Sequence, residues 1–231
     1  AKLSLKLDYL SSQEEELVDY LACFRAPASV SLLARLLGLP MEEVVEITEE
    51  FGQKQLLMEE EQGEELVVRF SQELLRIYAY ERLSLAKKRM LHHQIAQGME
   101  DQLGDSLYHA QLLNEIAYHY KLSKQPIKSL EYELHYLEAT LKFHHELFPI
   151  YSREFGFIEK TDDSNQSAVL DQFDRIRREI EGLERKHQNH KDFQLLVLRF
   201  LYLEGRYAIR TGNYQQGMDN IQQVIASAKE L

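Results

Sequence analysis

The sequence is poor in residues that cross-link a chain or interrupt helices. It has one cysteine, no tryptophan, four prolines and ten glycines among 231 residues. Cys23 alone cannot form an internal disulfide, and its apolar helical context predicts a core residue in a reducing compartment, so we expect a cytoplasmic protein. Because no apolar run approaches the length of a membrane span, and the N-terminus has no basic-then-apolar signal pattern, we expect no membrane partner.

Positive charge is also scarce. The formal net charge is −11, which argues against non-specific affinity for nucleic acid, because that affinity depends on neutralising phosphates. The charge is unevenly distributed: Pro40–Glu65 holds ten glutamates and one lysine, whereas Arg69–His93 holds six basic residues and two glutamates. An acidic surface followed directly by a basic one favours protein–protein or intramolecular contacts. The six basic residues are Arg69, Arg76, Arg82, Lys87, Lys88 and Arg89.

The length of the chain bounds its organisation. A chain of 231 residues suffices for one large or two modest domains, each with its own core. Its apolar content of 44% and charged content of 28% are those of an ordinary globular protein, so we expect a packed fold. The chain begins with Ala-Lys rather than Met, which predicts a fragment of a larger protein.

The first part of the chain has the element order of a winged-helix domain. Helix starts are predicted from Ser caps and first-turn glutamates, and helix ends from Pro27 and Gly38. Two apolar segments around a polar turn that contains Gly63 predict a β-hairpin. The expected elements are a strand or extended lead-in at 2–7, a helix that begins after Ser11 or Ser12, a second helix ended by Gly38, a third at about 41–53, and the hairpin at 56–70.

The sequence after Ser71 predicts almost only helix. The expected helices are 71–80, 84–103, 107–122, 126–146, 167–187, 191–211 and 213–230, with one extended loop at 155–167 that is rich in Gly, Asp, Asn and Ser. Two helix pairs have small residues twelve positions apart, Ala117 with Ser129 and Gly205 with Gly217, which lets antiparallel helices approach closely. This spacing resembles the tetratricopeptide repeat, a helix–turn–helix unit of 34 residues.

We therefore expect a mainly α fold, with an N-terminal winged-helix domain that has a small β-hairpin, followed by a tetratricopeptide-like α-α superhelix. The expected domains are a degenerate winged helix at 1–70, a connecting helical arm at 71–106, and helical repeats at 107–231. The separation of Ala117 and Gly205 is not a multiple of 34, so the intervening helix pair must be enlarged or irregular. An α-solenoid of roughly three helix pairs is the simplest interpretation.

The segment 68–101, VRFSQELLRIYAYERLSLAKKRMLHHQIAQGMED, resembles the region that follows the nucleotide-binding module in STAND-type signalling ATPases, a class that includes the maltose-regulon activators. The positions that carry the resemblance are Phe70, Arg76, Tyr78, Leu83-Ser84, Arg89, Leu91-His92, Ile95-Ala96 and Glu100. Residues 7–24 resemble the opening helix of the family's winged-helix domain, and IAYHYKLSKQPIKSLEY resembles its first helical repeat. Residues 141–192 match no part of the family.

The resemblance implies a regulatory fragment of a signal-transduction protein that regulates transcription. Its winged helix would dock on the parent's own ATPase module, and ATP or ADP would bind that module. The chain itself has no G-x-x-x-x-G-K-[ST] phosphate loop, so we expect no cofactor in this fragment.

The glutamates agree with a winged helix that does not read DNA. The third helix, MEEVVEITEEFGQK, carries five glutamates, and the hairpin segment EEEQGEE carries five more. Phosphates would repel this face, so we expect no direct DNA binding through it. Two interpretations stay open: a solvated acidic face, or a surface that docks on protein.

Arginines on the helix at 191–211 are the candidate ligand-binding residues. Arg199, Arg206 and Arg210 fall within about 40° of arc at helical spacing, with Tyr202 beside them. The helix would line the concave groove of a superhelix, where arginine forks suit carboxylates or phosphates. Alignment with the earlier repeat adds Asn114, Tyr118 and Lys121 to the predicted ligand- or partner-binding set. The alternative is a solvated stripe paired with nearby glutamates such as Glu204.

We expect neither catalysis nor a metal site in the chain. There is no Gly-x-Ser-x-Gly, no cysteine pair and no His-Glu-x-x-His, and the members of His92-His93 and of His144-His145 point about 100° apart on a helix. Two alternative functions stay open. One is a free-standing peptide- or protein-binding tetratricopeptide adaptor, which the upstream reading frame distinguishes. The other is a DNA-binding regulator that uses the basic helix at 82–93, which a gel-shift titration against salt distinguishes.

Overall fold

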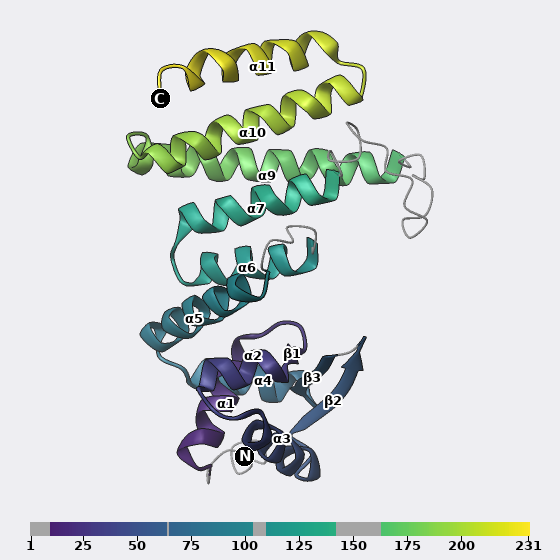
Figure 1. Ribbon diagram of the computed structural model, residues 1–231, viewed down its shortest axis with the longest axis vertical. Coiled ribbons are helices and arrows are strands. Elements are labelled where there is room, and N and C mark those ends of the chain that lie inside the picture. The colour runs from purple at the N-terminus through teal and green to yellow at the C-terminus, as the bar shows by residue number, and fades with distance from the viewer. Residues whose placement is uncertain (1–9, 64, 104–109, 142–162) are drawn as a thin grey trace. The chain divides into compact units, whose positions relative to one another are not determined.

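The computed structural model describes residues 10–63, 65–103, 110–141 and 163–231, with side chains from 167 onward in the last range. This part of the chain is mainly helical, as predicted, and contains ten helices and a small three-stranded antiparallel sheet (Figure 1). It divides into two compact units. The first comprises Ala1–Gly104 with His119–Lys124, and the second comprises Asp105–Tyr118 with Gln125–Leu231. None of the described helices is both long enough and apolar enough to cross a membrane.

Helix α1, Ser12–Cys23, begins at the predicted cap. The Ser11 hydroxyl accepts a hydrogen bond from the Glu14 backbone N–H at 3.3 Å, and the Glu14 carboxylate accepts one from the Ser11 N–H at 2.6 Å. This reciprocal capping box satisfies two N–H groups that the first turn of a helix leaves without intrahelical partners. The bond from the Ser11 backbone holds the pKa of Glu14 below its usual value.

The next two helices follow the predicted pattern closely. Helix α2 spans Val30–Leu37 and ends at Gly38, whose φ of 65° is the left-handed conformation that glycine adopts at helix ends. Helix α3 spans Met41–Gln53, the same bounds that the sequence predicts. Val44, Thr48 and Phe51 are its buried residues, at the 4,3 spacing of one helical face.

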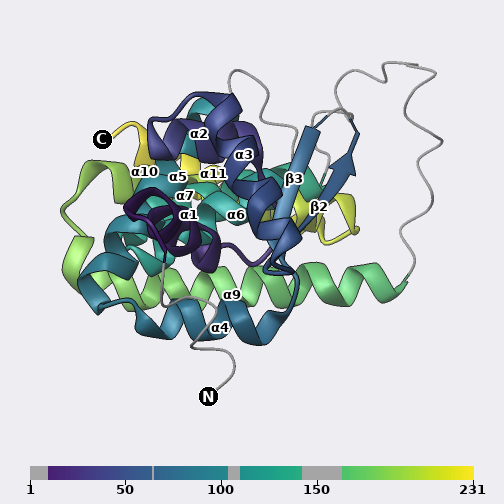
Figure 2. The same ribbon diagram turned by 90° about the horizontal axis from the view of Figure 1, so that it is seen from below.

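A hairpin forms the main part of the sheet, as predicted for residues 56–70. Strands β2, Leu57–Gln62, and β3, Glu65–Phe70, pair antiparallel in a register that sets Leu57 opposite Phe70. Gly63 has a φ of 65°, a conformation that the tight turn between the strands requires. Figure 2 shows the hairpin beside α3, against which β2 packs.

A third strand, β1, was not predicted from the sequence. It is only two residues long, Ala28–Ser29, and pairs with Val68 and Val67 of β3, so the strand order is β1–β3–β2. The same Ser29 caps α2, because its hydroxyl accepts a hydrogen bond from the Leu32 N–H at 3.3 Å. The edge strands of this sheet are therefore β1 and β2.

Two more helices belong to the first unit. Helix α4 spans Glu73–Arg82 and contacts α1, while α5 spans Leu85–Leu103 and contacts α1 and α2. The sequence analysis placed both in a connecting arm, and the structure packs both within the first unit. A Cβ at Gly98 would lie 3.0 Å from the Leu32 side chain, so the glycine allows α5 to approach α2 closely.

The second unit is a set of stacked helices (Figure 1). They are α7, Pro126–Leu141, α9, Asp163–His187, α10, Lys191–Arg210, and α11, Tyr214–Ala228, together with the N-terminal part of α6, Ala110–Leu122. Its core joins α7, α9 and α10 through buried Leu137, Phe173, Ile176 and Phe200 among others. Burial of these apolar faces is the main stabilising contribution to such a helical stack.

The predicted close approaches of small residues are confirmed. A Cβ at Gly205 would lie 3.1 Å from the Gly217 carbonyl oxygen, and a Cβ at Gly217 would lie 2.7 Å from the Gly205 oxygen, so α10 and α11 touch backbone to backbone. In the earlier pair, the Ser129 hydroxyl donates to the Ala117 carbonyl at 3.1 Å, and both residues are buried.

One expectation about the loop at 155–167 is wrong. Its last residues, 163–167, belong to α9, which begins at Asp163. Small polar residues favour helix N-termini as well as turns, so the composition alone did not separate the two. Residues 155–162, the extended segment at 2–7 and the last part of the helix predicted at 126–146 lie outside the described residues.

Candidate interaction surfaces

Helix α3 presents only acidic charge to solvent. Val44, Thr48 and Phe51 turn inward, and all five glutamates of the helix are exposed, namely Glu42, Glu43, Glu46, Glu49 and Glu50. Of these five, Glu50 has a cationic partner in the described part of the chain, Lys54, at 2.6 Å. The hydrogen bond with Glu50 raises the pKa of Lys54. The exposed side of α3 therefore carries a largely uncompensated negative charge.

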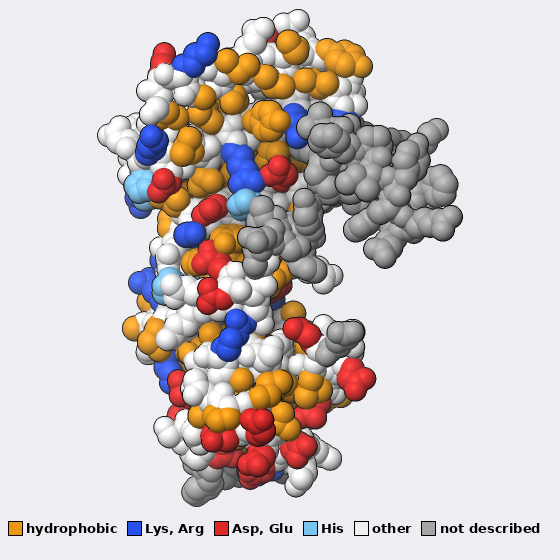
Figure 3. All heavy atoms as spheres, in the orientation of Figure 1, with side chains coloured by type: hydrophobic (Ala, Val, Ile, Leu, Met, Phe, Trp, Pro, Cys, Tyr) orange, Lys and Arg blue, Asp and Glu red, His pale blue; other side chains and the backbone are white. Residues whose placement is uncertain are grey.

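Strand β2 extends this charge. Glu59 and Glu61 are exposed, while Glu60 pairs across the hairpin with Arg69 at 2.6 Å. Figure 3 shows acidic side chains, with hydrophobic ones between them, gathered over the region of α3 and β2. Exposed Met41 and Met58 belong to these two elements. We call the exposed residues of α3 and β2 the acidic surface; it combines negative charge with apolar side chains.

Most basic residues of the segment 69–93 have partners within the first unit. Arg69 pairs with Glu60, and Lys88 lies 3.6 Å from Glu81 and over the ring of Tyr80. The Arg76 guanidinium pairs with Glu73 and donates to the Ala22 carbonyl at 3.0 Å. Lys87 pairs with Asp19. Only a part of the basic charge in this segment is therefore available to a phosphate backbone, which weighs against the DNA-binding alternative.

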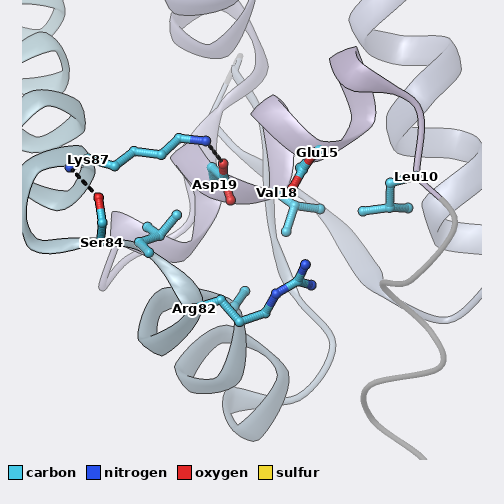
Figure 4. Close-up of a pocket in the computed structure, with 9 residues that line it drawn as sticks. Leu10, Glu15, Val18, Asp19, Arg82, Ser84 and Lys87 are labelled. Carbon is cyan, nitrogen blue, oxygen red and sulfur yellow. Dashed lines mark hydrogen bonds and ion pairs between the residues drawn. The ribbon is translucent and has the colours of Figure 1, made fainter.

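A cavity of about 250 Å³ lies between α1, α4 and the start of α5 (Figure 4). Asp19, which is 7% exposed, forms its ion pair with Lys87 here, and the Ser84 hydroxyl accepts a hydrogen bond from the Lys87 backbone N–H at 3.2 Å. Arg82 extends from α4 toward α1. The volume is below the range of about 300–1,000 Å³ of typical ligand pockets, and the lining charges have both signs. The cavity is therefore not treated as a ligand site.

The predicted arginine row lies on α10, but its first member is engaged within the second unit. Arg199 forms an ion pair with Glu138 of α7, and its guanidinium lies against the His135 ring with nitrogen–nitrogen distances of 3.1 Å. Burial, and then the nearby Arg199 charge, lowers the pKa of His135. The alternative interpretation pairs the row with nearby glutamates such as Glu204. Arg199 does pair with a glutamate, Glu138, whereas Glu204 accepts hydrogen bonds from Arg177 and Asn220.

The other predicted residues are divided between two helices. The Arg206 guanidinium carbon lies 5.6 Å from the centre of the Tyr202 ring, and Arg210 donates to the Leu141 carbonyl at 2.7 Å. Asn114, Tyr118 and Lys121 lie on α6, Lys121 in the part that belongs to the first unit. That the predicted residues of α6 and those of α10 form one common ligand site stays a prediction.

A buried histidine pair was missed by the sequence analysis. His92 of α5 and His119 of α6 are both fully buried in the first unit, with their Nδ1 atoms 2.8 Å apart. His92 Nε2 also hydrogen-bonds the Tyr80 hydroxyl at 3.1 Å, and Phe24 packs edge-on against His119. Burial lowers the pKa of His92 to about 4 and that of His119 well below its usual value, so both rings are neutral at pH 7.

The described residues show no metal-binding cluster. Across them, no group of three or more His, Cys, Asp or Glu side chains is placed to hold a metal ion. Cys23 is buried, and burial raises the pKa of its thiol to about 12, so it is not a reactive nucleophile. His144 and His145 lie outside the described residues.

No protein-family model, curated protein or solved structure matches the chain. The inference about function therefore depends on the surfaces described above.

Proposed function

We propose that the chain is a non-catalytic regulatory fragment of a signalling ATPase. Residues 1–70 are a degenerate winged helix that docks on the parent's nucleotide-binding module, and the second unit is a tetratricopeptide-like superhelix that binds an effector or a protein. The acidic surface, at the position where a DNA-reading winged helix would carry positive charge, is the observation that carries the proposal.

The order of elements supports a winged helix. Helix α1, the short strand β1, helices α2 and α3, and the β2–β3 hairpin follow one another, and all three strands form one antiparallel sheet. Helices α2 and α3 contact each other as a helix–turn–helix pair does, which makes α3 the counterpart of the recognition helix. The hairpin is then the wing.

The charge on that module supports docking on protein rather than on DNA. A recognition helix enters the major groove with phosphates on both sides, where Lys and Arg contribute most of the affinity. Here the corresponding helix exposes five glutamates, and β2 exposes two more. A surface that also exposes Met41 and Met58 fits a protein partner with basic and apolar residues.

The second unit supports a binding role for the helical repeats. Gly205 and Gly217 allow close antiparallel packing of α10 and α11, which is the feature that such repeats require. Arg206, which stacks on Tyr202, and Arg210, which donates to the Leu141 carbonyl, remain the predicted contacts for carboxylates or phosphates of an effector. An effector could change how the winged helix holds the nucleotide module only by binding the two arrangements with different affinity.

Charge reversal on α3 tests the docking. We expect Glu42→Lys, Glu46→Lys and Glu49→Lys together, in the complete gene product, to change the rate of ADP release by roughly tenfold or more, since like charges would then face a basic docking site. None of the three carboxylates forms an ion pair in the described structure, so the fold should tolerate the change. The measurement is stopped-flow release of a fluorescent ADP analogue.

The matched control reverses three exposed carboxylates on α9, with Asp171→Lys, Glu181→Lys and Glu184→Lys. Its ADP release should equal that of the wild type. Equal rates in wild type, α3 variant and control would exclude docking through the acidic surface. A complete reading frame without a phosphate loop would exclude the ATPase and leave the adaptor function.

A further inference from the structure

Strand β2 forms an outer edge of the sheet in the first unit. Among the described residues, the strand order β1–β3–β2 leaves one side of β2 without a neighbouring strand, and Figure 1 shows it on the side of β3 away from β1. Its residues pair one for one with those of β3, from Leu57 opposite Phe70 to Gln62 opposite Glu65, so the strand has no bulge. A regular edge of this kind presents a row of backbone N–H and C=O groups to which a further strand can bond.

The hydrogen bonds of the hairpin determine which residues of β2 use their backbone groups inside the sheet. The Ser71 N–H donates to the Leu56 carbonyl at 2.9 Å, so Leu56, which precedes the strand, directs its carbonyl to the side of β3. In an antiparallel pair the backbone groups of successive residues point alternately toward the neighbouring strand and away from it. The residues of β2 that direct both groups away from β3 are therefore Leu57, Glu59 and Glu61. We call the outward N–H and C=O groups of these three residues the β2 edge.

The side chains along the β2 edge are acidic. Glu59 and Glu61 are both exposed, and neither pairs with a cation of the described residues. They lie on the same face of the strand, because successive side chains of a strand point to opposite faces. Glu60 lies on the other face, where it pairs with Arg69 at 2.6 Å. The same two residues therefore provide outward backbone groups and uncompensated carboxylates.

This charge determines which kind of strand can pair with the β2 edge. Two copies of the chain paired antiparallel through it would place Glu59 and Glu61 of one copy opposite the same glutamates of the other. Like charges opposite each other destabilise a sheet, so the edge disfavours a second copy. A strand with Lys or Arg at alternate positions instead places a cation opposite each glutamate, which stabilises the pairing. The charge of the edge therefore selects a basic strand.

We propose that the β2 edge binds an extended basic segment of a partner protein by strand addition. Backbone hydrogen bonds to Leu57, Glu59 and Glu61 supply the affinity, as they do where a peptide adds a strand to a sheet. Lys or Arg side chains at every second position of the segment face the two glutamates and supply the specificity. This mode of binding rests on the proposed function, because it specifies how the acidic surface docks on protein and which chemistry the docking segment has.

Amide hydrogen exchange of the 231-residue chain, followed by NMR, tests the proposal with the blocked peptide Thr-Lys-Val-Lys-Val-Lys-Thr as the probe. At saturating peptide, the N–H groups of Leu57, Glu59 and Glu61 should exchange more slowly by a factor of about ten or more. Two further probes have the same sequence and charge, but one is N-methylated at its lysines and the other at its valines. Only one of these two sets of N–H groups faces β2 in a paired strand, so one probe should protect the β2 edge and the other should not.

Charge reversal provides a second measurement. Glu59→Lys with Glu61→Lys should abolish protection by the unmethylated peptide, because the lysines of the peptide would then face like charges. Both side chains are exposed, so the circular dichroism spectrum should stay unchanged. The matched control is Glu181→Lys with Glu184→Lys on α9, which makes the same change in net charge at exposed positions and should keep the protection.

Absence of protection in the wild type, equal protection by both methylated probes, or loss of protection in the α9 control would each overturn strand addition. These results are distinguishable from failure of the proposed function. A changed rate of ADP release in the α3 variant without protection of the β2 edge would retain docking and reject strand addition. Protection of the β2 edge in a protein whose complete reading frame lacks a phosphate loop would reject the ATPase and retain strand addition with another protein partner.

Discussion

Gly217→Ala is expected to destabilise the second unit by about 2 kcal/mol. An alanine Cβ at this position would lie 2.5 Å from Ile209 Cγ1 and 2.7 Å from the Gly205 carbonyl oxygen. The side chain of Ile209 could rotate, but the Gly205 oxygen belongs to the backbone, so α11 must move away from α10. Overpacking of this kind costs about 1–3 kcal/mol, and the helix propensity of alanine offsets at most about 1 kcal/mol of it.

Urea unfolding followed by circular dichroism measures this loss, and hydrogen exchange locates it. Amides of α11 should exchange faster in the variant, while those of α1 and α3 should not change. Gly182→Ala on α9 is the matched control, since nothing lies within 4 Å of a Cβ there. It should be neutral or stabilise by up to about 1 kcal/mol. A Gly217→Ala protein as stable as the control would show that α10 and α11 do not pack as described.

Acidification from pH 7 to pH 5 is expected to destabilise the first unit through His92 and His119. Both have folded-state pKa values below their usual value of 6.5, so the unfolded state binds more protons below pH 6.5. The contribution of these two neutral histidines to the free energy of unfolding is therefore fully present above pH 6.5. It is lost as the pH falls toward 4. With a folded pKa of about 4, His92 alone accounts for about 2 kcal/mol at pH 5, and His119 acts in the same direction.

The measurement is the free energy of unfolding in urea at several pH values across this range. His92→Phe should be less stable than the wild type at pH 7, because the ring loses its contacts with Tyr80 and His119, but its stability should fall less steeply with acid. His190→Gln is the control, since His190 is exposed, and it should keep the wild-type slope. Equal slopes in all three proteins would mean that the buried pair does not control acid stability.

Local signals predicted much of the fold. The Ser11–Glu14 capping box, the Gly38 stop and the apolar spacing of α3 are contained within a few residues each, so the sequence located these helices. Gly205 and Gly217 were recognised as a close approach because only small residues allow two backbones to touch. For the three helix signals the physical cause lies in neighbouring positions of the chain, and the two glycines are only twelve residues apart.

The features that were missed depend on residues far apart in the sequence. Strand β1 has two residues, too few for any periodicity, and it forms because Ala28 meets Val68. The contact between His92 and His119 depends on how α5 and α6 pack, which no local pattern encodes. The alternative interpretation of the arginine row named Glu204 as a partner, whereas Arg199 pairs with Glu138 of α7, which is 61 residues away in the chain.

The most direct test of the account is hydrogen exchange of α3 and β2 in the complete gene product, compared with the 231-residue chain alone. Strand β2 is an edge strand, so half of its backbone N–H groups point away from β3 and exchange rapidly unless something covers them. If the acidic surface docks on the nucleotide module, the outward backbone N–H groups of Leu57–Gln62 should exchange more slowly in the complete protein, by a factor of about ten or more. Equal rates in the two proteins would contradict the docking role on which the proposed function depends.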